Sequence, residues 1–474
     1  MVQFGVSTRL KARRSSFPLL LWASRFGIAV IVYICLSMIA TMIDIEAPAD
    51  HGDLVAIHLA HATAITAEER EERESKKAKA LESEDQPQIA VTTSNSNTTK
   101  IGFAVTITSC GTHTGAMPFP ISEGAAVLSY SIRRASIHGN QGGRYDYELY
   151  AIYHPDAEPC AETLRDLGYT LLKRDTPVQV NEIQGDFLRE KIAKNGCCGE
   201  RELIKLEAYT LTQHAVMVIL DLDALILHPM DAIFDLMLEH TSPPTDHIQW
   251  KEEPLPSDIS IIYTIDYAMV NPKRKIKPVQ GGFVVMRPNQ TVYEEFRDIV
   301  RKGDYRDHGG WGGKSGKFWG SMTFQGLLPY YYKILHPGRD VEFNRCIYNN
   351  MCSNHRTEKA VNDTHLPGDC FTQEEDCEDC RARPVEEIVS THFTVCQKPW
   401  LCMRHAKDSI NHRLCRSLHE QWYLARSEME TSWGRSGYGN GTDDREHFHG
   451  YCHTYGERGY DLIQKPYGKA INEL

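Results

Sequence analysis

The 474-residue sequence predicts an α/β domain with a mostly parallel central sheet, behind one N-terminal transmembrane helix. Between residues 101 and 240, strand-like apolar runs alternate with helix-like segments, which is typical of parallel sheets with helical crossovers. The run 215–227 (AVMVILDLDALIL) is rich in Val, Ile and Leu and is interpreted as a buried strand of that sheet. The apolar segment 26–43 is long enough to be the transmembrane helix.

The chain begins with a basic tail and an apolar span. Residues 1–25 carry five Lys or Arg side chains close to the span, and residues 26–43 carry no charged side chain. Acidic residues follow the span, so the positive-inside rule places the tail in the cytosol and the rest of the chain outside it. A cleaved signal peptide is the alternative. The long basic lead and the lack of an obvious small-residue cleavage site favour an uncleaved signal anchor.

Residues 44–100 are expected to form a disordered stem. Segment 66–85 alternates Glu, Arg and Lys, and segment 91–99 is rich in Ser, Thr and Asn. Neither composition can bury a hydrophobic core, so both segments should be solvated. Anchor, stem and a large C-terminal domain form the layout of a single-pass type II membrane protein of the secretory pathway.

Cysteines and glycosylation sequons agree with this location. Of fourteen cysteines, thirteen follow the span, a density that suits disulfides in an oxidising compartment. The odd number predicts a free thiol or a disulfide-linked homodimer. Four Asn-x-Ser/Thr sequons also follow the span, at Asn97, Asn289, Asn362 and Asn440. The net charge of -11 gives no indication of nucleic-acid binding.

The elements of the domain are expected in a regular order. Strands are predicted at 101–108, 147–153, 169–172 and 215–227, and helices at 123–136, 200–213 and 230–238. Pro229 suits the first turn of the last of these helices. Because ligands of parallel sheets bind at the carboxyl ends of the strands, the end of strand 215–227 is the expected site.

Two aspartates, Asp221 and Asp223, interrupt the apolar run 215–227. Buried carboxylates are unfavourable unless they are paired, hydrogen-bonded or bound to a metal. Residues two apart in an extended segment also point to the same side. The pattern therefore predicts a strand that brings both carboxylates to one point, where a divalent cation binds them together with substrate phosphates. Structural or capping aspartates are the alternative.

Two glycine-rich segments follow. Segment 280–286 joins Gly281 and Gly282 to an apolar run, and glycines there allow a ligand to approach the backbone. A simple turn at the start of a strand explains them equally well. Segment 303–320 holds seven glycines and is expected to be a mobile loop or lid. It lacks the spacing of a P-loop, which argues against a nucleoside triphosphatase.

The last two segments carry cysteines and a histidine. Segment 370–380 is an acidic insertion with three cysteines, for which a disulfide-stapled surface loop is favoured over a zinc site. In segment 388–400, His392 ends a strand-like run and Lys398 follows it. His392 suits a borderline cation such as Mn²⁺, and Lys398 suits a diphosphate. A histidine that is satisfied within the core is the alternative.

Together these segments resemble the glycogenin-type glycosyltransferases, family eight of the retaining enzymes. Residues 204–234 resemble the family's helix, strand, Asp-x-Asp and following helix, and residues 325–328 resemble its Gln-Gly-Leu-Leu segment. Residues 392–400 resemble its closing His-x-x-Gly-x-x-Lys-Pro-Trp motif, and residues 123–132 are similar to the helix after its first strand. The resemblance covers roughly residues 101–400.

The resemblance implies a Rossmann-like GT-A fold over residues 101–415, followed by a C-terminal extension over 416–474. It implies transfer of a hexose or pentose, with retention of configuration, from a nucleotide sugar (usually UDP-linked) to a glycan or glycoprotein. Mn²⁺ or another divalent cation is implied as cofactor, and a Golgi or ER membrane as location. The implied metal ligands are Asp221, Asp223 and His392, the catalytic residue is Gln325, and the donor-binding residues are Thr108, Lys205, Leu222, Gly281, Gly282 and Lys398.

The sequence departs from the family in two places. Val395 replaces the glycine of the closing motif and would crowd a close approach of phosphate to the backbone. Residues 321–324 supply no carboxylate, although the family often has aspartates there, so another acidic residue substitutes or none is needed. A catalytically impaired GT-A-fold protein that binds a nucleotide sugar or glycan is the alternative function. The tail with His447, His449 and His453 is expected to wrap the surface, with a second metal site as alternative.

Overall fold

The computed structural model describes residues 99–110, 121–249, 254–269, 274–361, 364–402, 410–454, 456, 459–465 and 467. These residues belong to one structural unit, Ser96–Leu474. The predicted tail at 1–25, the span at 26–43 and almost all of the stem at 44–100 lie outside the described residues. Within the described part of the chain, no helix is both long and apolar enough to cross a membrane.

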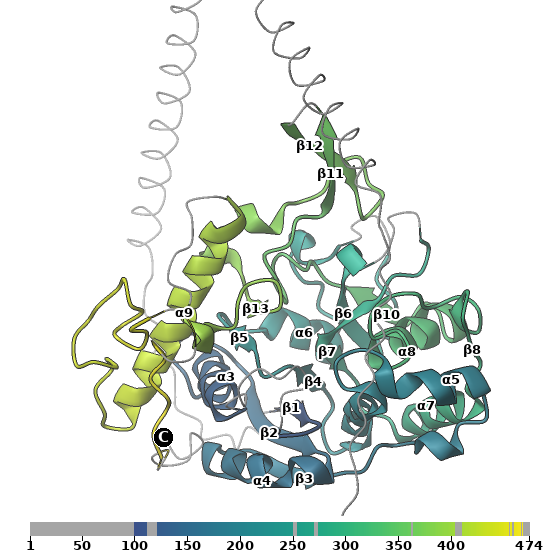
Figure 1. The fold of residues 1–474 in the computed structure, drawn as a ribbon, viewed down its shortest axis with the longest axis horizontal. Helices are drawn as coiled ribbons and strands as arrows, with labels where there is room; N and C mark the ends of the chain where they lie inside the picture. Colours follow the sequence, from purple (N-terminus) through teal and green to yellow (C-terminus); the bar gives the residue numbers. More distant parts are fainter. Residues whose placement is uncertain are drawn as a thin grey trace, which may run out of the picture. The chain divides into compact units, whose positions relative to one another are not determined.

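A seven-stranded sheet forms the centre of the domain, in the order β10-β6-β7-β4-β1-β2-β3 (Figure 1). Its strands are β1 (Lys100–Ile107), β2 (Asp146–Tyr153), β3 (Thr170–Lys173), β4 (Met217–Leu220), β6 (Ile261–Ile265), β7 (Val279–Met286) and β10 (Asp340–Glu342). Within this sheet β7 runs antiparallel to its neighbours β4 and β6, and the other neighbouring strands pair in parallel. The prediction of an α/β domain with a mostly parallel sheet is confirmed.

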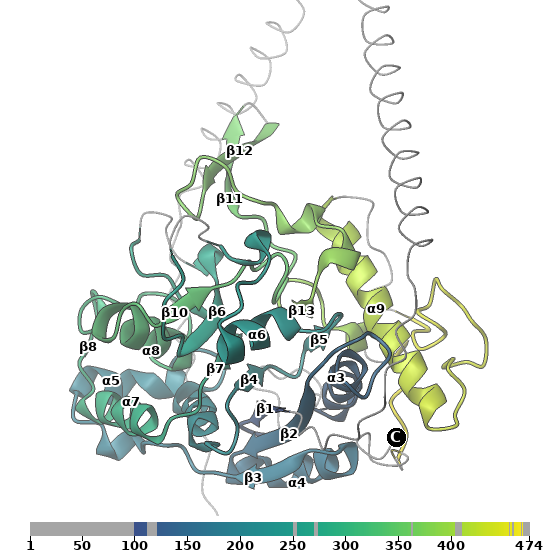
Figure 2. The ribbon, with the colours of Figure 1, turned by 180° about the vertical axis from the view of Figure 1, so that it is seen from behind.

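Helices cover both faces of the sheet (Figures 1 and 2). The helices include α3 (Ile121–Ala135), α4 (Glu158–Ala161), α5 (Asp186–Lys191), the 3₁₀ helix η5 (Gly199–Thr210), α6 (Asp231–Glu239), α7 (Gln290–Lys302), α8 (Phe324–Tyr330) and α9 (Ile410–Ser432). Apolar side chains of α3 and α6 join one hydrophobic core, and those of η5, α7 and α8 join a second core. Of the strands between the two cores, β4 (MVIL) is apolar and buried at every position, as expected for a strand that is covered on both faces.

Three short strand pairs complete the fold. They are β5 (Ala224–Ile226) with β13 (Ser390–His392), β8 (Tyr305–Arg306) with β9 (Gly310–Trp311), and β11 (Arg356–Val361) with β12 (Thr364–Cys370). The β11–β12 hairpin extends away from the central sheet in both views (Figures 1 and 2). β1, α3, β2, β3 and α6 lie within two residues of their predicted ranges. The predicted boundary between residues 415 and 416 falls inside α9.

The prediction of one strand over residues 215–227 is wrong. β4 ends at Leu220, and the backbone then turns, because the amide of Ala224 donates to the carbonyl of Asp221 at 3.0 Å. β5 follows the turn and pairs with β13 instead of joining the central sheet. Aspartate favours such turns. The sequence is apolar on both sides of the turn because β5, which follows it, is buried as well.

Two further elements differ from their predicted type of secondary structure. The helix predicted at 200–213 is the 3₁₀ helix η5. The glycine-rich segment 303–320 contains the packed β8–β9 hairpin in place of the mobile loop that was expected. Trp311 in this hairpin is fully buried, and its indole donates to the carbonyl of Ser321 at 2.9 Å. Gly310 has a φ of +76°, and a Cβ there would collide with the Ser315 carbonyl, so the hairpin requires this glycine.

Disulfides tie the described loops together. The pairs are Cys110–Cys160, Cys197–Cys198, Cys346–Cys380, Cys370–Cys377, Cys396–Cys415 and Cys402–Cys452. Cys352 is the free cysteine among the described residues, and it is buried. The predicted disulfide-rich domain with an unpaired thiol is therefore confirmed there. The burial of Cys352 gives no support to the disulfide-linked homodimer that the odd count allowed.

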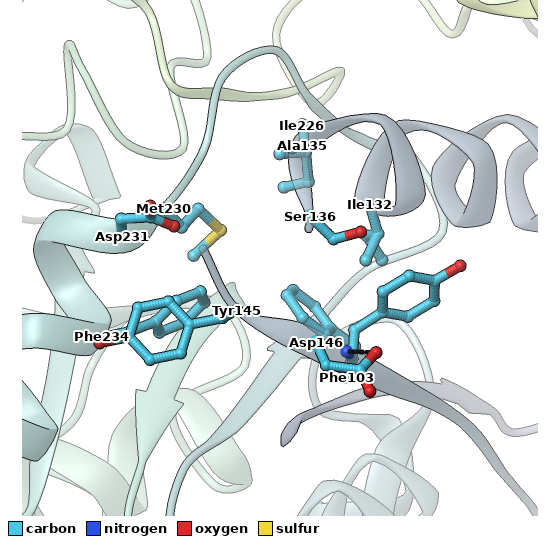
Figure 3. A pocket seen from close by; sticks show the side chains of 11 residues that line it. Phe103, Ile132, Ala135, Ser136, Tyr145, Asp146, Ile226, Met230, Asp231 and Phe234 are labelled. Atoms are coloured by element: carbon cyan, nitrogen blue, oxygen red, sulfur yellow. Dashed lines mark hydrogen bonds between the residues drawn. The ribbon is translucent and has the colours of Figure 1, made fainter. Parts of the chain in front are cut away.

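A small cavity lies between α3, β2 and α6 (Figure 3). Its volume of about 20 Å³ is close to that of one water molecule, and Phe103, Ile132 and Phe234 are among its lining residues. The rings of Phe103 and Phe234 pack edge to face at 6.3 Å beside it. Since the space holds no more than a water molecule, it is a packing gap rather than a ligand site.

Candidate metal centre

The carboxyl edge of the sheet brings together residues that are far apart in the sequence. The turn with Asp221 and Asp223 follows β4 at this edge. β13 pairs antiparallel with β5, which sets His392 opposite Ala224, the residue directly after the turn. The amide of Phe393 also donates to the carbonyl of Asp223 at 2.9 Å. Backbone pairing therefore holds the histidine beside the two aspartates.

Asp221, Asp223 and His392 form one cluster of potential metal ligands. One ligand atom of each lies within 4.8 Å of the other two. Nε2 of His392 is 3.2 Å from Asp223 Oδ1 and 3.8 Å from Asp221 Oδ2. The side chain of His392 is 4% exposed, that of Asp223 12% and that of Asp221 34%. The cluster is thus buried at the histidine and reaches solvent at Asp221, where a substrate can join it.

The donor set fits a divalent cation. Two carboxylates and an imidazole suit Mn²⁺, and three protein ligands leave coordination positions for substrate oxygens. Nδ1 of His392 is buried and has no hydrogen-bond partner among the described residues, so this ring is not explained as a satisfied core histidine. The two carboxylates also meet a histidine and two lysines, contacts that are compatible with the alternative of structural or capping aspartates as well as with a metal site.

Two lysines neutralise the two aspartates. Nζ of the buried Lys205 donates to Asp221 Oδ1 and to the carbonyl of Gly281, both at 2.9 Å. Lys398 forms an ion pair with Asp223 Oδ2 and keeps 32% of its side chain exposed. Lys205 therefore acts inside the protein, whereas Lys398 can also reach a ligand at the surface.

Charges within the cluster set the pKa values of its members. Burial alone would raise the pKa of Asp223, but His392 and Lys398 hold it below its ordinary value. Burial alone would lower the pKa of Lys205, but Asp221 and Glu202 raise it above its ordinary value. Asp223 and Lys205 are consequently both charged at neutral pH, and the cluster is electrostatically organised before any ligand binds.

Gly281 and Gly282 lie inside β7, so the interpretation as a turn at the start of a strand is wrong. A Cβ on Gly282 would collide with the His392 ring and would lie 2.7 Å from Asp221 Oδ2. A Cβ on Gly281 would lie 3.0 Å from Gln325 Cγ. The glycines make room for the side chains of the cluster, a role that segment 280–286 alone did not indicate.

Gln325 and Glu202 border the cluster on its inner side. Gln325 Oε1 accepts from the Gly281 amide at 3.3 Å, and its Nε2 donates to the Trp319 carbonyl at 3.4 Å. Glu202 is only 6% exposed and lies 3.8 Å from Lys205 Nζ. It accepts a 2.6 Å hydrogen bond from Thr323, the residue directly before α8. Burial raises the pKa of Glu202 and Lys205 opposes that shift.

Glu202 was not among the predicted site residues, although a substitute carboxylate from elsewhere in the chain was one of the two expectations for residues 321–324. Its spacing of three residues from Lys205 within a predicted helix was the available signal.

The remaining predicted residues lie near the cluster. Thr108 directly follows β1 at the same sheet edge but enters none of the described contacts that define the cluster. Leu222 lies in the turn, and its carbonyl packs so closely on α3 that a Cβ at Gly124 would collide with it. Val395 is 62% exposed, so its side chain faces solvent instead of filling the cluster. No donor contact of Thr108 or Leu222 follows from these positions.

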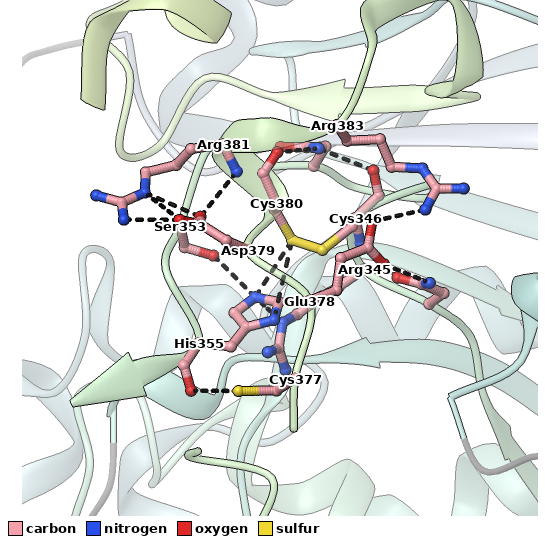
Figure 4. Close-up of a disulfide and its surroundings, with 12 residues drawn as sticks. Arg345, Cys346, Ser353, His355, Cys377, Glu378, Asp379, Cys380, Arg381 and Arg383 are labelled. Carbon is pink, nitrogen blue, oxygen red and sulfur yellow. Dashed lines mark hydrogen bonds and ion pairs between the residues drawn. A yellow bond between two sulfur atoms is a disulfide. The ribbon is translucent and has the colours of Figure 1, made fainter. Parts of the chain in front are cut away.

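The other cysteine and histidine groups are occupied by other partners. Figure 4 shows His355 beside the Cys346–Cys380 disulfide, with its Nε2 3.3 Å from Cys380 Sγ. Cys377 pairs with Cys370, so the disulfide-stapled loop predicted in place of a zinc site is confirmed.

The histidines of the C-terminal tail form separate pairs. His447 pairs with Asp444 at 2.7 Å, His449 with Asp443 at 2.8 Å and His453 with Asp461 at 3.1 Å. These three do not gather into a ligand group within the described residues. The tail therefore gives no support to a second metal site.

Fold and site together define an α/β domain with a two-aspartate, one-histidine cluster at the carboxyl edge of its sheet. No protein-family model and no curated protein sequence matches the chain. Among solved structures, the chain is similar to the galactosyltransferase LgtC in complex with donor and acceptor sugar analogues. The identity is 10%, the match covers 68% of this chain and 94% of that chain, and the TM-score is 0.36.

Two further glycosyltransferases are similar to the chain. Mouse xyloside xylosyltransferase 1 in its apo form is 12% identical over 54% of this chain and 88% of that chain, with a TM-score of 0.33. The bifunctional glycosyltransferase WbbM is 11% identical over 67% of this chain and 48% of that chain, with a TM-score of 0.33. Similarity at this level does not define an activity for this chain.

Proposed function

We propose that the chain is a metal-dependent glycosyltransferase that moves a sugar from a nucleotide-sugar donor, UDP-linked, to a glycan or glycoprotein acceptor. The observation that carries this proposal is the meeting of Asp221, Asp223 and His392 with two lysines at the carboxyl edge of an α/β sheet. Ligands of such sheets bind at this edge. Three of the four segments that resemble family eight, 204–234, 325–328 and 392–400, carry residues of the cluster or of its border, which supports a retaining transfer.

In this proposal Asp221, Asp223 and His392 hold Mn²⁺ or another divalent cation, which supplies stabilisation of negative charge on the diphosphate. When the glycosidic bond of the donor breaks, charge accumulates on the phosphate oxygens of the leaving group. Lys398 is partly exposed beside Asp223 and can donate to one of those oxygens. Lys205 pairs with Asp221 and fixes the Gly281 carbonyl from inside the protein.

We also propose that Glu202 supplies the carboxylate that is missing from residues 321–324. Its side chain joins Lys205 to Thr323, and Thr323 precedes the helix that carries Gln325. Glu202 thereby links the donor side of the cluster to the helix that carries the implied catalytic residue Gln325. A group held in this way keeps its geometry before substrate binds, which favours catalysis.

A lumenal location of the catalytic domain, in the Golgi or ER, is part of the proposal. It is supported by the six disulfides among the described residues, since such bonds persist in oxidising compartments. Two predicted sequons, Asn289 and Asn440, lie at exposed positions. Membrane anchoring through residues 26–43 stays a prediction from the sequence.

The function is tested by incubating the full-length chain with Mn²⁺ and a panel of UDP-sugars, with and without glycan acceptors, and by measuring UDP release. Release that requires Mn²⁺ and increases with an acceptor supports the transferase. Mn²⁺-dependent UDP binding without release from any donor supports instead the impaired, binding-only alternative. A chain that neither releases nor binds UDP contradicts both functions.

Gly282→Ala is expected to weaken Mn²⁺ binding about 10- to 100-fold, the usual effect of disturbing the residues that orient metal ligands. The new methyl group would push the His392 ring and the Asp221 carboxylate apart. Calorimetric titration of Mn²⁺ measures the effect. Gly281→Ala is the matched control, because the nearest atoms to its Cβ belong to Gln325 and Lys205 instead of His392 and Asp221. Equal Mn²⁺ affinity of Gly282→Ala and wild type would show that His392 does not bind the cation.

A further inference from the structure

We propose that the C-terminal helix α9 positions Lys398, so that the C-terminal extension is a working part of the donor site and Tyr423 is a positioning residue. This inference rests on the proposed function, because it takes Lys398 as the lysine that meets the donor diphosphate. From its sequence, the extension is expected to wrap the surface, with a second metal site as the alternative. In the structure, it makes hydrogen bonds and disulfides with the Lys398 loop, which we define as residues 393–402.

The backbone on both sides of Lys398 is bonded to α9. The hydroxyl of Tyr423 donates to the carbonyl of Pro399 at 2.7 Å. Nε2 of the His419 ring lies 2.7 Å from the carbonyl oxygen of Gln397. Residues 397 and 399 are the two neighbours of Lys398, so α9 holds the chain directly before and directly after the lysine.

Of these two contacts, the hydrogen bond from Tyr423 to Pro399 is the stronger one. The Nδ1 atom of His419 also lies 2.7 Å from a carbonyl, that of Cys415, and burial lowers the pKa of His419 to about 4. A neutral imidazole donates only one hydrogen bond, so His419 can satisfy only one of these two carbonyls. The Tyr423 hydroxyl has a proton of its own to donate and is therefore the better object for a test.

Covalent bonds reinforce the same attachment. The Cys396–Cys415 disulfide joins the start of the Lys398 loop to α9, and the Cys402–Cys452 disulfide joins its end to the tail beyond α9. The Lys398 loop is thus attached at both ends, to α9 and to the tail beyond α9. Bonds of this kind limit the conformations open to the loop and reduce the entropy lost when a ligand orders it.

α9 is itself firmly seated, which a positioning element requires. Tyr423 is fully buried and its ring stacks on Phe448 at 4.8 Å. Further along α9, the guanidinium of Arg426 lies 4.9 Å from the ring of Tyr460, whose hydroxyl donates to Glu123 of α3 at 2.5 Å. α3 and α9 lie side by side in both views (Figures 1 and 2). The helix therefore rests on the same domain that carries the aspartates.

Fixed backbone geometry matters at Lys398 because its own side chain is long and one-third exposed. A mobile lysine loses rotamer freedom when it contacts a phosphate, and a mobile backbone adds to that loss. The Pro399 carbonyl also accepts from the Cys402 amide at 2.9 Å, in the 3₁₀ turn that begins after Lys398. Removal of the Tyr423 hydroxyl should loosen this turn and the lysine with it.

Tyr423→Phe tests the inference because it removes one hydroxyl and keeps the ring. We expect the KM for the nucleotide sugar to rise about two- to tenfold, the range of one lost hydrogen bond, with kcat and the Mn²⁺ half-saturation unchanged. Tyr169→Phe is the matched control, since it also removes a buried tyrosine hydroxyl that donates to a backbone carbonyl, that of Ala125 in α3, away from the Lys398 loop. A donor KM equal to wild type in Tyr423→Phe, or raised equally in Tyr169→Phe, would overturn the inference.

A second variant tests the covalent attachment. Cys396 and Cys415 must be replaced together, because the sulfur of Cys352 lies within 4.8 Å of both and could pair with a single remaining thiol. In Cys396→Ser/Cys415→Ser, we expect faster hydrogen exchange at the Leu401 and Cys402 amides and a raised donor KM. Unchanged exchange and an unchanged donor KM would contradict the inference.

Hydrogen exchange also separates this inference from the proposed function. If wild type neither binds nor releases UDP, the proposed function fails and Lys398 has no donor to meet, so the inference fails with it. Faster exchange in Tyr423→Phe would in that case identify α9 as a structural support alone. If wild type is active and only the donor KM of Tyr423→Phe stays unchanged, the proposed function stands and the inference alone fails.

Discussion

Asp223→Asn is expected to lower kcat/KM for sugar transfer by about 10²- to 10³-fold or more, the range found when a charge-stabilising group is removed from an active site. Asp223 is nearly buried and contacts both His392 and Lys398. The neutral amide would be a poor metal ligand and would leave the lysine without its carboxylate. The loss should therefore affect the cation and the diphosphate contact together.

UDP release at saturating Mn²⁺ measures this effect, with calorimetric titration of Mn²⁺ as an independent readout. Asp298→Asn is the matched control, because the Asp298 side chain is 77% exposed and pairs only loosely with Arg301 at 3.5 Å. Wild-type turnover in Asp223→Asn would refute the metal site and its role in catalysis. Recovery of activity at higher Mn²⁺ would limit the role of Asp223 to cation affinity.

Lys205→Met is expected to reduce the free energy of unfolding by about 3–5 kcal/mol, the usual result of removing one partner of a buried ion pair. Lys205 lies between Asp221 and Glu202, and it also donates to the Gly281 carbonyl. Methionine fills a similar volume but leaves the carboxylates of Asp221 and Glu202 without the lysine ammonium group between them. The protein should respond by loosening the cluster or by protonating Glu202.

Urea unfolding followed by circular dichroism measures the loss. The double variant Lys205→Met/Glu202→Gln should recover part of it, because the second change removes one of the two unpaired charges. Lys302→Met, at an exposed position at the end of α7, is the control for the substitution itself. A Lys205→Met protein as stable as wild type would show that the lysine is not needed to hold the two carboxylates.

Sequence patterns located the cluster but not the geometry that forms it. Asp221 and Asp223 were expected to converge because alternate residues of a strand share a face. They converge instead through a turn, with His392 held opposite Ala224 by a β-strand pair. The residue types and their order along the chain were sufficient to select the candidate ligands, since unpaired carboxylates are unfavourable in an apolar run.

Local sequence patterns could not identify Glu202 or the role of α9. Glu202 contacts Thr323 across 121 residues, and Tyr423 contacts Pro399 across 24 residues. Neither contact follows a helical or strand period, because each joins elements whose spatial order is decided by packing. Buried polar groups must find partners wherever the fold supplies them, so their partners emerge only from the assembled structure.

The sequence by itself determined the α/β class, the mostly parallel sheet, the disulfide-rich domain and the candidate ligands Asp221, Asp223 and His392. These follow from periodicity, composition and the unfavourable energy of unpaired charge in an apolar run, all of which are local properties. The tertiary structure alone decided that the aspartates lie in a turn, that Lys205 and Glu202 form a buried pair beside them, and that α9 holds Lys398. Those features depend on packing and hydrogen bonding between residues far apart in the chain, which cannot be inferred from any short segment of the sequence.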